Sequence, residues 1–439
     1  MRHEPITLQD CEQRDAQDPL RALRAQFHLP DGVIYLDGNS LGALPRSALA
    51  AVERTLREEW GQGLIRSWND AGWIDLPGRI GDKIASLIGA SPGTVVATDT
   101  TSINLYKVLS AALELAGLDA PGRRKVVSER SNFPTDLYIA QSVCRHYGCT
   151  LELVDSTEID AAMTDDVAVL MLTHVHYRTG TMLDMRATTA QAHAAGALVV
   201  WDLAHSAGAV PVALEDAQAD FAVGCGYKYL NGGPGAPAFV WVNPRHTDRV
   251  RQPLSGWFGH ATPFAFTPQY EPASGIGRYL CGTQPILAMR ALESGVDSVL
   301  AAGGSAANGH DAMQALRTKS LALTDLFIAL VEQRCASHRL AMVTPRAHGR
   351  RGSQVSLTPA EGAYPIMQAL IARGVIGDFR AGDPQAAAGH ADGHDILRFG
   401  FTPLYTGFAD VWHAAEHLQQ VLDGGEWRQA QFHRKQAVT

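Results

Sequence analysis

The chain has 439 residues, 46% hydrophobic and 19% charged, which is enough for two or three domains with buried cores. A formal net charge of −8 excludes a broad basic surface, so neither nucleic acid nor an acidic membrane surface is an expected partner. No apolar run approaches the roughly 20 residues of a membrane span, and the N-terminus contains no apolar signal core. We therefore expect a cytoplasmic protein.

The six cysteines are scattered, with no CxxC pair and no histidine at metal-binding spacing. They are Cys11, Cys144, Cys149, Cys225, Cys281 and Cys335. We expect reduced, mostly buried thiols, no disulfide and no metal site.

The first 45 residues are expected to form an N-terminal arm. It leads to VIYLDGNSLG (33–42), whose pattern predicts a short strand ending in a turn. Pro45 then marks a helix start, and apolar residues at helical spacing predict a helix over 46–60.

Between residue 46 and about residue 245, apolar strands alternate with amphipathic helices. Helices are predicted over 101–116, 134–148 and 184–196, and strands over 125–129, 167–172, 197–202, 219–226 and 236–242. Fully apolar strands separated by helices are typical of an α/β fold, with a mostly parallel sheet covered by helices on both faces.

After about residue 310 the pattern changes to helices alternating with short strands. Helices are predicted over 320–333 and 365–374, and strands over 340–345, 353–359 and 396–401. The segment DPQAAAGHADGHD (383–395) predicts an exposed, mobile loop. The expected organisation is an arm over 1–45 that packs with the small domain, a large domain over 46–310 and a smaller α+β domain over 311–439.

Several polar residues follow predicted strands, where open parallel sheets bind ligands. Asp202 and His205 follow one strand, Thr173 follows another, and Lys228 follows a third within GYKYLNGGPG. An aspartate that pairs with a pyridine nitrogen and a lysine that forms a Schiff base are the two groups pyridoxal phosphate requires. Taken alone, the aspartate is also explained by a turn and the lysine by a solvated surface charge.

Two predicted helix starts add further polar groups. In SNFPTD, Phe133 can stack on an aromatic ring, while Asp136 can hold a cofactor or cap the helix. In DTTSIN, the hydroxyls of Thr101 and Ser102 join the helix N-terminus in a site suited to phosphate, although capping explains them too.

The motifs DLAHSAG and GYKYLNGGPG resemble those of pyridoxal-phosphate enzymes with the aspartate-aminotransferase fold (fold type I), in the branch that contains cysteine desulfurases. The motifs YLDGNSLG, SNFPTD, YKYLNGGPG, GWFGH and RFGFTPLY resemble the kynureninase family more closely. The resemblance extends from about residue 33 to about residue 415.

The resemblance implies that Lys228 is the Schiff-base lysine and that the domain over 46–310 binds the cofactor. The implied cofactor-binding residues are Thr101, Ser102, Phe133, Asp136, Thr173, Asp202, His205, Tyr227, Lys228, Trp257 and Thr283. Trp257 and Thr283 would reach the phosphate from the other subunit, which implies a homodimer with shared active sites. Family members often carry Asn where this chain has Thr283, so that contact is an open point.

For the substrate, the resemblance implies that Arg398 binds the α-carboxylate, for which a guanidinium is suited, and that Ser40 faces the substrate. A surface arginine and a turn-forming serine are the alternatives. Trp68 and Trp73 can wall an aryl pocket or pack in the core.

The implied reaction is hydrolysis of L-kynurenine to anthranilate and L-alanine by cleavage of Cβ–Cγ, in tryptophan catabolism and NAD biosynthesis. Lys228 would move the Cα proton, and Tyr227 would relay a proton to Cβ. Whether 3-hydroxykynurenine is also a substrate stays open.

Three other functions are alternatives to this one. A cysteine desulfurase or selenocysteine lyase needs a thiol on a mobile loop, whereas Cys335 continues a helix and Cys281 lies close to the expected phosphate contact. An aminotransferase matches the motifs less well. A cofactor-binding regulator would add a DNA-binding segment, and no basic patch indicates one.

Overall fold

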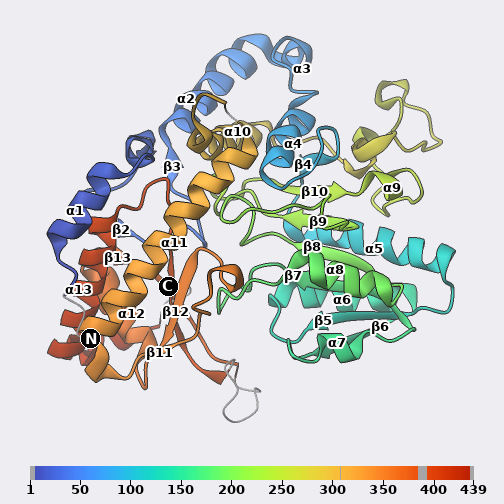
Figure 1. Ribbon diagram of the computed structural model, residues 1–439. Helices are drawn as coiled ribbons and strands as arrows, with labels where there is room; N and C mark the ends of the chain where they lie inside the picture. The colour runs from blue at the N-terminus through green and yellow to red at the C-terminus, as the bar shows by residue number, and fades with distance from the viewer. Residues whose placement is uncertain (1–4, 307, 384–392, 436–439) are drawn as a thin grey trace.

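A seven-stranded sheet forms the centre of the computed structural model, which describes residues 5–306, 308–383 and 393–435 (Figure 1). The strand order is β4-β10-β9-β8-β7-β5-β6, and β10 runs antiparallel to both of its neighbours while the others run parallel. The strands are β4 (Val95–Thr98), β5 (Lys125–Glu129), β6 (Thr150–Val154), β7 (Val167–Thr173), β8 (Leu198–Asp202), β9 (Phe221–Gly224) and β10 (Ala238–Val242). The predicted α/β fold with a mostly parallel sheet is confirmed.

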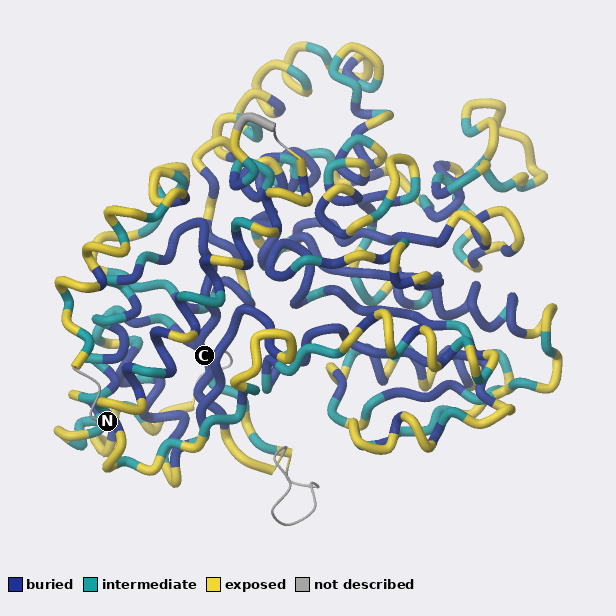
Figure 2. Tube along the Cα trace, in the orientation of Figure 1, coloured by how far each residue is buried: buried dark blue, intermediate teal, exposed yellow. Residues whose placement is uncertain are grey.

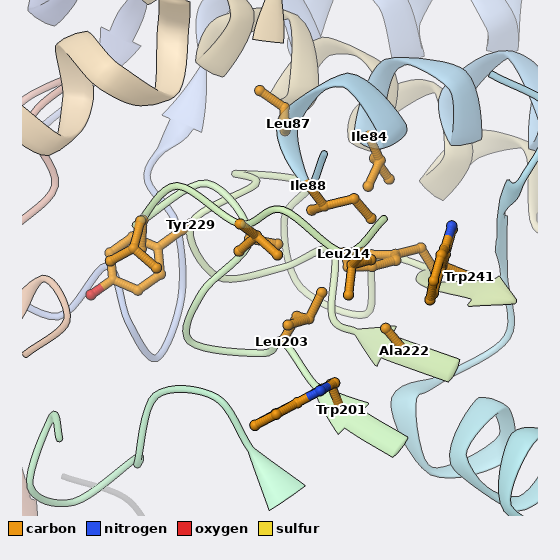
Figure 3. Packing of buried hydrophobic residues seen from close by; sticks show 14 of the residues in the cluster. Ile84, Leu87, Ile88, Trp201, Leu203, Leu214, Ala222, Tyr229 and Trp241 are labelled. Carbon is orange, nitrogen blue, oxygen red and sulfur yellow. The ribbon is translucent and has the colours of Figure 1, made fainter. Parts of the chain in front are cut away.

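Both faces of this sheet carry a hydrophobic cluster and are covered by helices. This follows from strands that are apolar throughout, because successive side chains point to opposite faces. On one face Trp201, Ala222 and Trp241 belong to one hydrophobic cluster with Ile84 and Ile88 at α4 (Figure 3). The side chains between them along the strands, among them Val200, Val223 and Val240, belong to a separate cluster on the other face. The helices around the sheet are α4 (Leu76–Leu87), α5 (Thr101–Asp119), α6 (Pro134–Tyr147), α7 (Ile159–Ala162), α8 (Met185–Ala194), α9 (Pro244–Thr247) and α10 (Ile286–Leu300).

The C-terminal part has its own hydrophobic cluster around an antiparallel sheet of order β11-β12-β15-β14. Its elements are α11 (Gly309–Arg334), β11 (Ala341–Met342), β12 (Gln354–Thr358), α12 (Ala363–Ala372), β13 (Val375–Ile376), β14 (Asp378–Arg380), β15 (Ile396–Gly400) and α13 (Phe408–Gly424). This arrangement agrees with the smaller α+β unit expected from the sequence.

The N-terminal segment lies along this C-terminal part. Helix α1 (Leu8–Gln17) packs on α13 (Figure 1), and the Asp15 carboxylate accepts hydrogen bonds from the first amides of α13. Strand β2 (Ile34–Tyr35) pairs with β13, while β1 (Phe27–His28) pairs with β3 (Leu44–Pro45).

The expected helix over 46–60 divides into two. Helix α2 (Arg46–Arg54) continues as a π-helix, η2 (Thr55–Gly63), before the short α3 (Ser67–Asp70). This region is largely exposed in Figure 2, whereas the central strands are buried. Most of the loop expected over 383–395 lies outside the described residues. Among the residues that are described, no helix combines the length and apolar character needed to cross a membrane.

Candidate active site

A pocket of about 220 Å³ opens where β7, β8 and β9 end and α5 and α6 begin. It is lined by Thr100, Thr101, Ser102, Phe133, Thr135, Asp136, Thr173, Tyr177, Asp202, Ala204, His205, Tyr227 and Lys228. The residues predicted from strand ends and helix starts are thus brought together at one edge of the sheet, where parallel α/β sheets bind ligands.

Lys228 lies in the turn that follows β9, beside the histidine that follows β8. Its Nζ is 3.0 Å from His205 Nε2, and it lies 5.9 Å from the centre of the Phe133 ring and 5.6 Å from that of Tyr227. The buried His205 has a pKa well below its usual range, chiefly because of burial and next because of the neighbouring Lys228. A neutral imidazole at this position can accept a hydrogen bond from the lysine amine.

Close backbone approach holds the lysine turn in place. The Gly42 amide donates to the Tyr227 carbonyl at 2.8 Å, and a Cβ at Gly42 would lie 2.4 Å from the Lys228 carbonyl oxygen. The YLDGNSLG segment therefore requires glycine here because it packs directly against the backbone that carries the lysine.

Two carboxyl groups of the lining, Asp136 and Asp202, are buried. Burial raises the pKa of Asp202, and burial together with the adjacent Asp202 raises that of Asp136 well above its usual range. Asp202 accepts a hydrogen bond from the Ala204 amide at 2.8 Å, while Asp136 Oδ2 has no hydrogen-bond partner among the described residues. The pair can therefore accept further hydrogen bonds or balance a cationic ligand.

The starts of the two helices differ in their capping. Thr100 caps α5, since its hydroxyl accepts from the Ile103 amide at 3.3 Å, and this leaves Thr101 and Ser102 facing the pocket. Helix α6 has Phe133 at its N-cap and no side-chain capping bond. Asp136 is therefore not a helix cap, which removes the alternative left open by the sequence.

Arg398 lies beside the pocket rather than in its lining. It is buried on β15, forms an ion pair with Asp378 of β14, and donates to the Ser40 hydroxyl at 2.6 Å. It also donates to the Tyr177 carbonyl at 2.7 Å, and Tyr177 is itself a lining residue. The alternative of a surface arginine is excluded by this burial.

Trp257 and Thr283 are exposed and do not line the pocket of their own chain. Of the two candidate aryl-pocket residues, Trp73 is buried and donates from Nε1 to Glu59 at 2.7 Å. Trp68 packs edge-on to Trp73 and also contacts Phe258, which adjoins Trp257.

Sequence reasoning missed Tyr177, Asp378 and Arg380. Tyr177 packs edge-to-face with Phe133, with the ring centres 5.3 Å apart. Arg380 forms an ion pair with Asp378 at 2.7 Å, so two arginines share one carboxylate. Tyr177 could have been found four residues after Thr173, whereas β14 is too short to show a periodic pattern.

The thiol required by the desulfurase alternative is not supplied by Cys335. This residue is buried at the end of α11, and burial raises its pKa to about 12, so a reactive thiolate is disfavoured.

Comparison with known proteins gives consistent matches over nearly the whole chain. Residues 316–418 match the kynureninase C-terminal domain family, and residues 34–353 match the aminotransferase class-V family. Kynureninase from Pseudomonas fluorescens is 58% identical over 436 residues, which cover 99% of this chain and 100% of the relative. Kynureninase from Burkholderia pseudomallei strain K96243 is 56% identical over 97% of this chain and 98% of the relative.

A solved structure of cysteine desulfurase from Thermococcus onnurineus NA1 aligns with a TM-score of 0.75 over 92% of this chain and 98% of that chain. At 18% identity it shows the fold alone. The two kynureninases, in contrast, share more than half of their residues with this chain. Enzymes of these families use pyridoxal phosphate, which confirms the predicted cofactor class. This chain belongs to the kynureninase family.

Proposed function

We propose that this chain hydrolyses L-kynurenine to anthranilate and L-alanine with pyridoxal phosphate as its cofactor. The observation that carries the proposal is Lys228, whose amine lies 3.0 Å from His205 in a pocket that also holds two buried carboxyl groups. The 58% identity to a kynureninase supports the choice of reaction.

The residues around the pocket fit this cofactor. Asp202 would pair with the pyridine nitrogen, and a cationic ring would balance the two buried carboxyls and give Asp136 Oδ2 a hydrogen-bond donor. Phe133 would stack on the ring. The phosphate would lie at the N-terminus of α5 with the hydroxyls of Thr101 and Ser102, where the helix dipole favours an anion. Thr173, His205 and Tyr227 would complete the site.

When bound, the cofactor supplies an electron sink for the charge that develops at the substrate's Cα. Lys228 would hold the cofactor aldehyde until substrate arrives, and its released amine would then remove the Cα proton. Arg398 would bind the α-carboxylate and Ser40 would orient Arg398, with which it shares a hydrogen bond. Water would attack the γ-carbonyl, and Tyr227 would protonate Cβ once the Cβ–Cγ bond breaks.

A homodimer with shared active sites belongs to this proposal. Trp60, Leu64 and Ile65 are exposed apolar side chains at η2 and the turn that follows it. An open apolar cavity of about 430 Å³ beside η2 is lined by Trp60, Trp73 and residues 285–288, which begin two residues after Thr283. Exposed apolar surface of this kind is typical of a protein interface. In the proposed dimer, Trp257 and Thr283 would reach the partner's phosphate.

We further propose the division into an arm over 1–45, a cofactor-binding domain over 46–310 and a small domain over 311–439. We also propose that the enzyme is cytoplasmic and acts in tryptophan catabolism, in a pathway that feeds NAD biosynthesis. Activity on 3-hydroxykynurenine is tested by direct comparison of the two substrates.

Substitution of Lys228 tests the proposal. Purified protein with pyridoxal phosphate is expected to show the visible absorption band of a lysine-bound cofactor and to release fluorescent anthranilate from L-kynurenine. Lys228→Ala should lose both signals, while Lys125→Ala, at the opposite end of the parallel strands, should keep both. Absence of the band in the wild type, or turnover by Lys228→Ala, would refute the proposal.

A further inference from the structure

A fully buried lysine, Lys107, lies in α5 two turns after the proposed phosphate site and lines no part of the pocket. Its Nζ forms an ion pair with Asp99 and donates to the Tyr279 carbonyl at 2.6 Å. A buried ammonium group carries a large desolvation cost unless it is paired and hydrogen-bonded, so these partners are needed to stabilise it.

Asp99 holds an unusual backbone conformation directly before the Thr100 cap. Its φ is 47°, in the left-handed region that Asp and Asn adopt more readily than other non-glycine residues. The Asp99 carbonyl accepts from the Ala238 amide at 2.9 Å, and its carboxylate accepts from Lys107 and from the Thr98 hydroxyl. A residue in this region is held by its surroundings, and here the Ala238, Lys107 and Thr98 contacts fix Asp99 directly before the start of α5.

The same network reaches the segment that carries Thr283. The Thr98 hydroxyl lies 3.3 Å from Gln284 Oε1, and Gln284 Nε2 donates to the Gly282 carbonyl at 3.0 Å. Together with the Lys107 bond to Tyr279, these contacts hold residues 279–284 against the loop that precedes α5.

We propose that the Lys107–Asp99 ion pair is a positioning element for the cofactor phosphate. It fixes the Thr101–Ser102 helix start and the 279–284 segment relative to each other, although neither charged group touches the pocket. This inference rests on the proposed function, in which both elements bind phosphate. In the proposed homodimer the two elements serve different active sites, so one ion pair supports a phosphate contact in each.

A second buried ion pair, Lys319–Asp18, serves as a control for the Lys107–Asp99 pair. It distinguishes positioning of the phosphate site from a purely structural role. Lys319 is also buried, and its Nζ donates to the Pro403 carbonyl at 2.6 Å and pairs with Asp18 at 2.7 Å. This pair joins the N-terminal segment to the C-terminal part, and neither residue lines the pocket. Its loss should lower stability without changing phosphate recognition.

The test compares two ligands that differ only in the phosphate. Full-length wild type, Lys107→Met, Asp99→Asn and Lys319→Met are stripped of cofactor and titrated with pyridoxal phosphate and with pyridoxal, following the visible absorption band. We expect Lys107→Met and Asp99→Asn to weaken pyridoxal phosphate binding by about 10-fold or more, the scale of one charged hydrogen bond. Pyridoxal binding should change by less than about 2-fold, and Lys319→Met should keep the wild-type ratio of the two affinities.

An unchanged ratio of the affinities for pyridoxal phosphate and pyridoxal, whether both affinities fall equally or neither falls, would overturn the positioning role. It would leave the proposed function intact. A wild type that forms no band with either ligand would overturn both. Asp99→Asn keeps a side chain that tolerates the left-handed region, so it carries the test if Lys107→Met does not fold.

Discussion

Burial is the main influence on the pKa values of the His205 imidazole, the Tyr227 hydroxyl and the two carboxyl groups, Asp136 and Asp202. The pKa of His205 is lowered, while the pKa values of Tyr227, Asp136 and Asp202 are raised, and burial is the largest cause for each. His205 is therefore neutral and Tyr227 keeps its proton at neutral pH. A protonated phenol beside the lysine is suited to donate a proton to a carbanion.

Replacement of Tyr227 by Phe is expected to slow the release of anthranilate by about 10²–10⁴-fold, because it removes a proton donor but keeps the ring. Cofactor binding, measured by the visible band, should persist. Tyr229→Phe is the matched control, since this buried hydroxyl donates to the Ser353 carbonyl rather than facing the pocket. Full activity in Tyr227→Phe would contradict the assigned role.

Replacement of Arg398 by Lys is expected to raise the KM for L-kynurenine by about 10–100-fold, because a charged hydrogen bond contributes roughly 1.5–3 kcal/mol. The visible band should be retained, since Arg398 does not line the cofactor pocket. Arg351→Lys provides the control, because this buried arginine pairs with Asp325 in the C-terminal part. A KM that rises equally in both variants would point to general destabilisation.

Residues that follow a predicted strand or open a predicted helix could be placed from the sequence alone. Thr173 and Asp202 end their strands, and the topology of a parallel sheet then brings them to one edge. Arg380 could not be placed in this way, because its position depends on how the C-terminal part packs beside the pocket.

Among the elements, the long apolar strands β7 and β8 were predicted close to their observed bounds. Strand β4 and helix α4 were missed, the helix because two glycines interrupt its apolar repeat. The change from α2 to a π-helix at Thr55 has no local sequence signal that we identify.

A pH-sensitive group, His174, follows the last residue of β7. It is buried, and its Nδ1 lies 3.0 Å from the Ser206 hydroxyl. Burial lowers its pKa to about 4. The unfolded chain, with a histidine pKa near 6.5, therefore binds more protons between these values, so stability is full above about pH 6.5 and falls as pH drops towards 4. By pH 4, this residue alone lowers the free energy of unfolding by about 3 kcal/mol.

Urea unfolding at several pH values checks this expectation. His174→Asn should flatten the dependence between pH 4 and 6.5, leaving the part due to His205, whose pKa is shifted in the same direction. His146→Asn, at an exposed position on α6, should leave the wild-type slope. An unchanged slope in His174→Asn would show that this histidine does not carry the effect.

For the whole molecule, the proposed homodimer predicts that a charge on its apolar face disrupts assembly. Ile65 is 77% exposed in the single chain, and Ile65→Glu should produce monomers in light scattering and lower the affinity for pyridoxal phosphate. The control Leu118→Glu changes an apolar residue that is 63% exposed at the end of α5, and it should remain dimeric. A wild-type monomer with full activity would contradict shared active sites.

The decisive measurement is the fate of water oxygen during turnover of L-kynurenine in ¹⁸O-labelled water. Hydrolysis at Cβ–Cγ requires one labelled oxygen in the carboxylate of anthranilate, an equal amount of unlabelled alanine, and no product from Lys228→Ala. Anthranilate without label, or a keto acid in place of alanine, would contradict the proposed reaction.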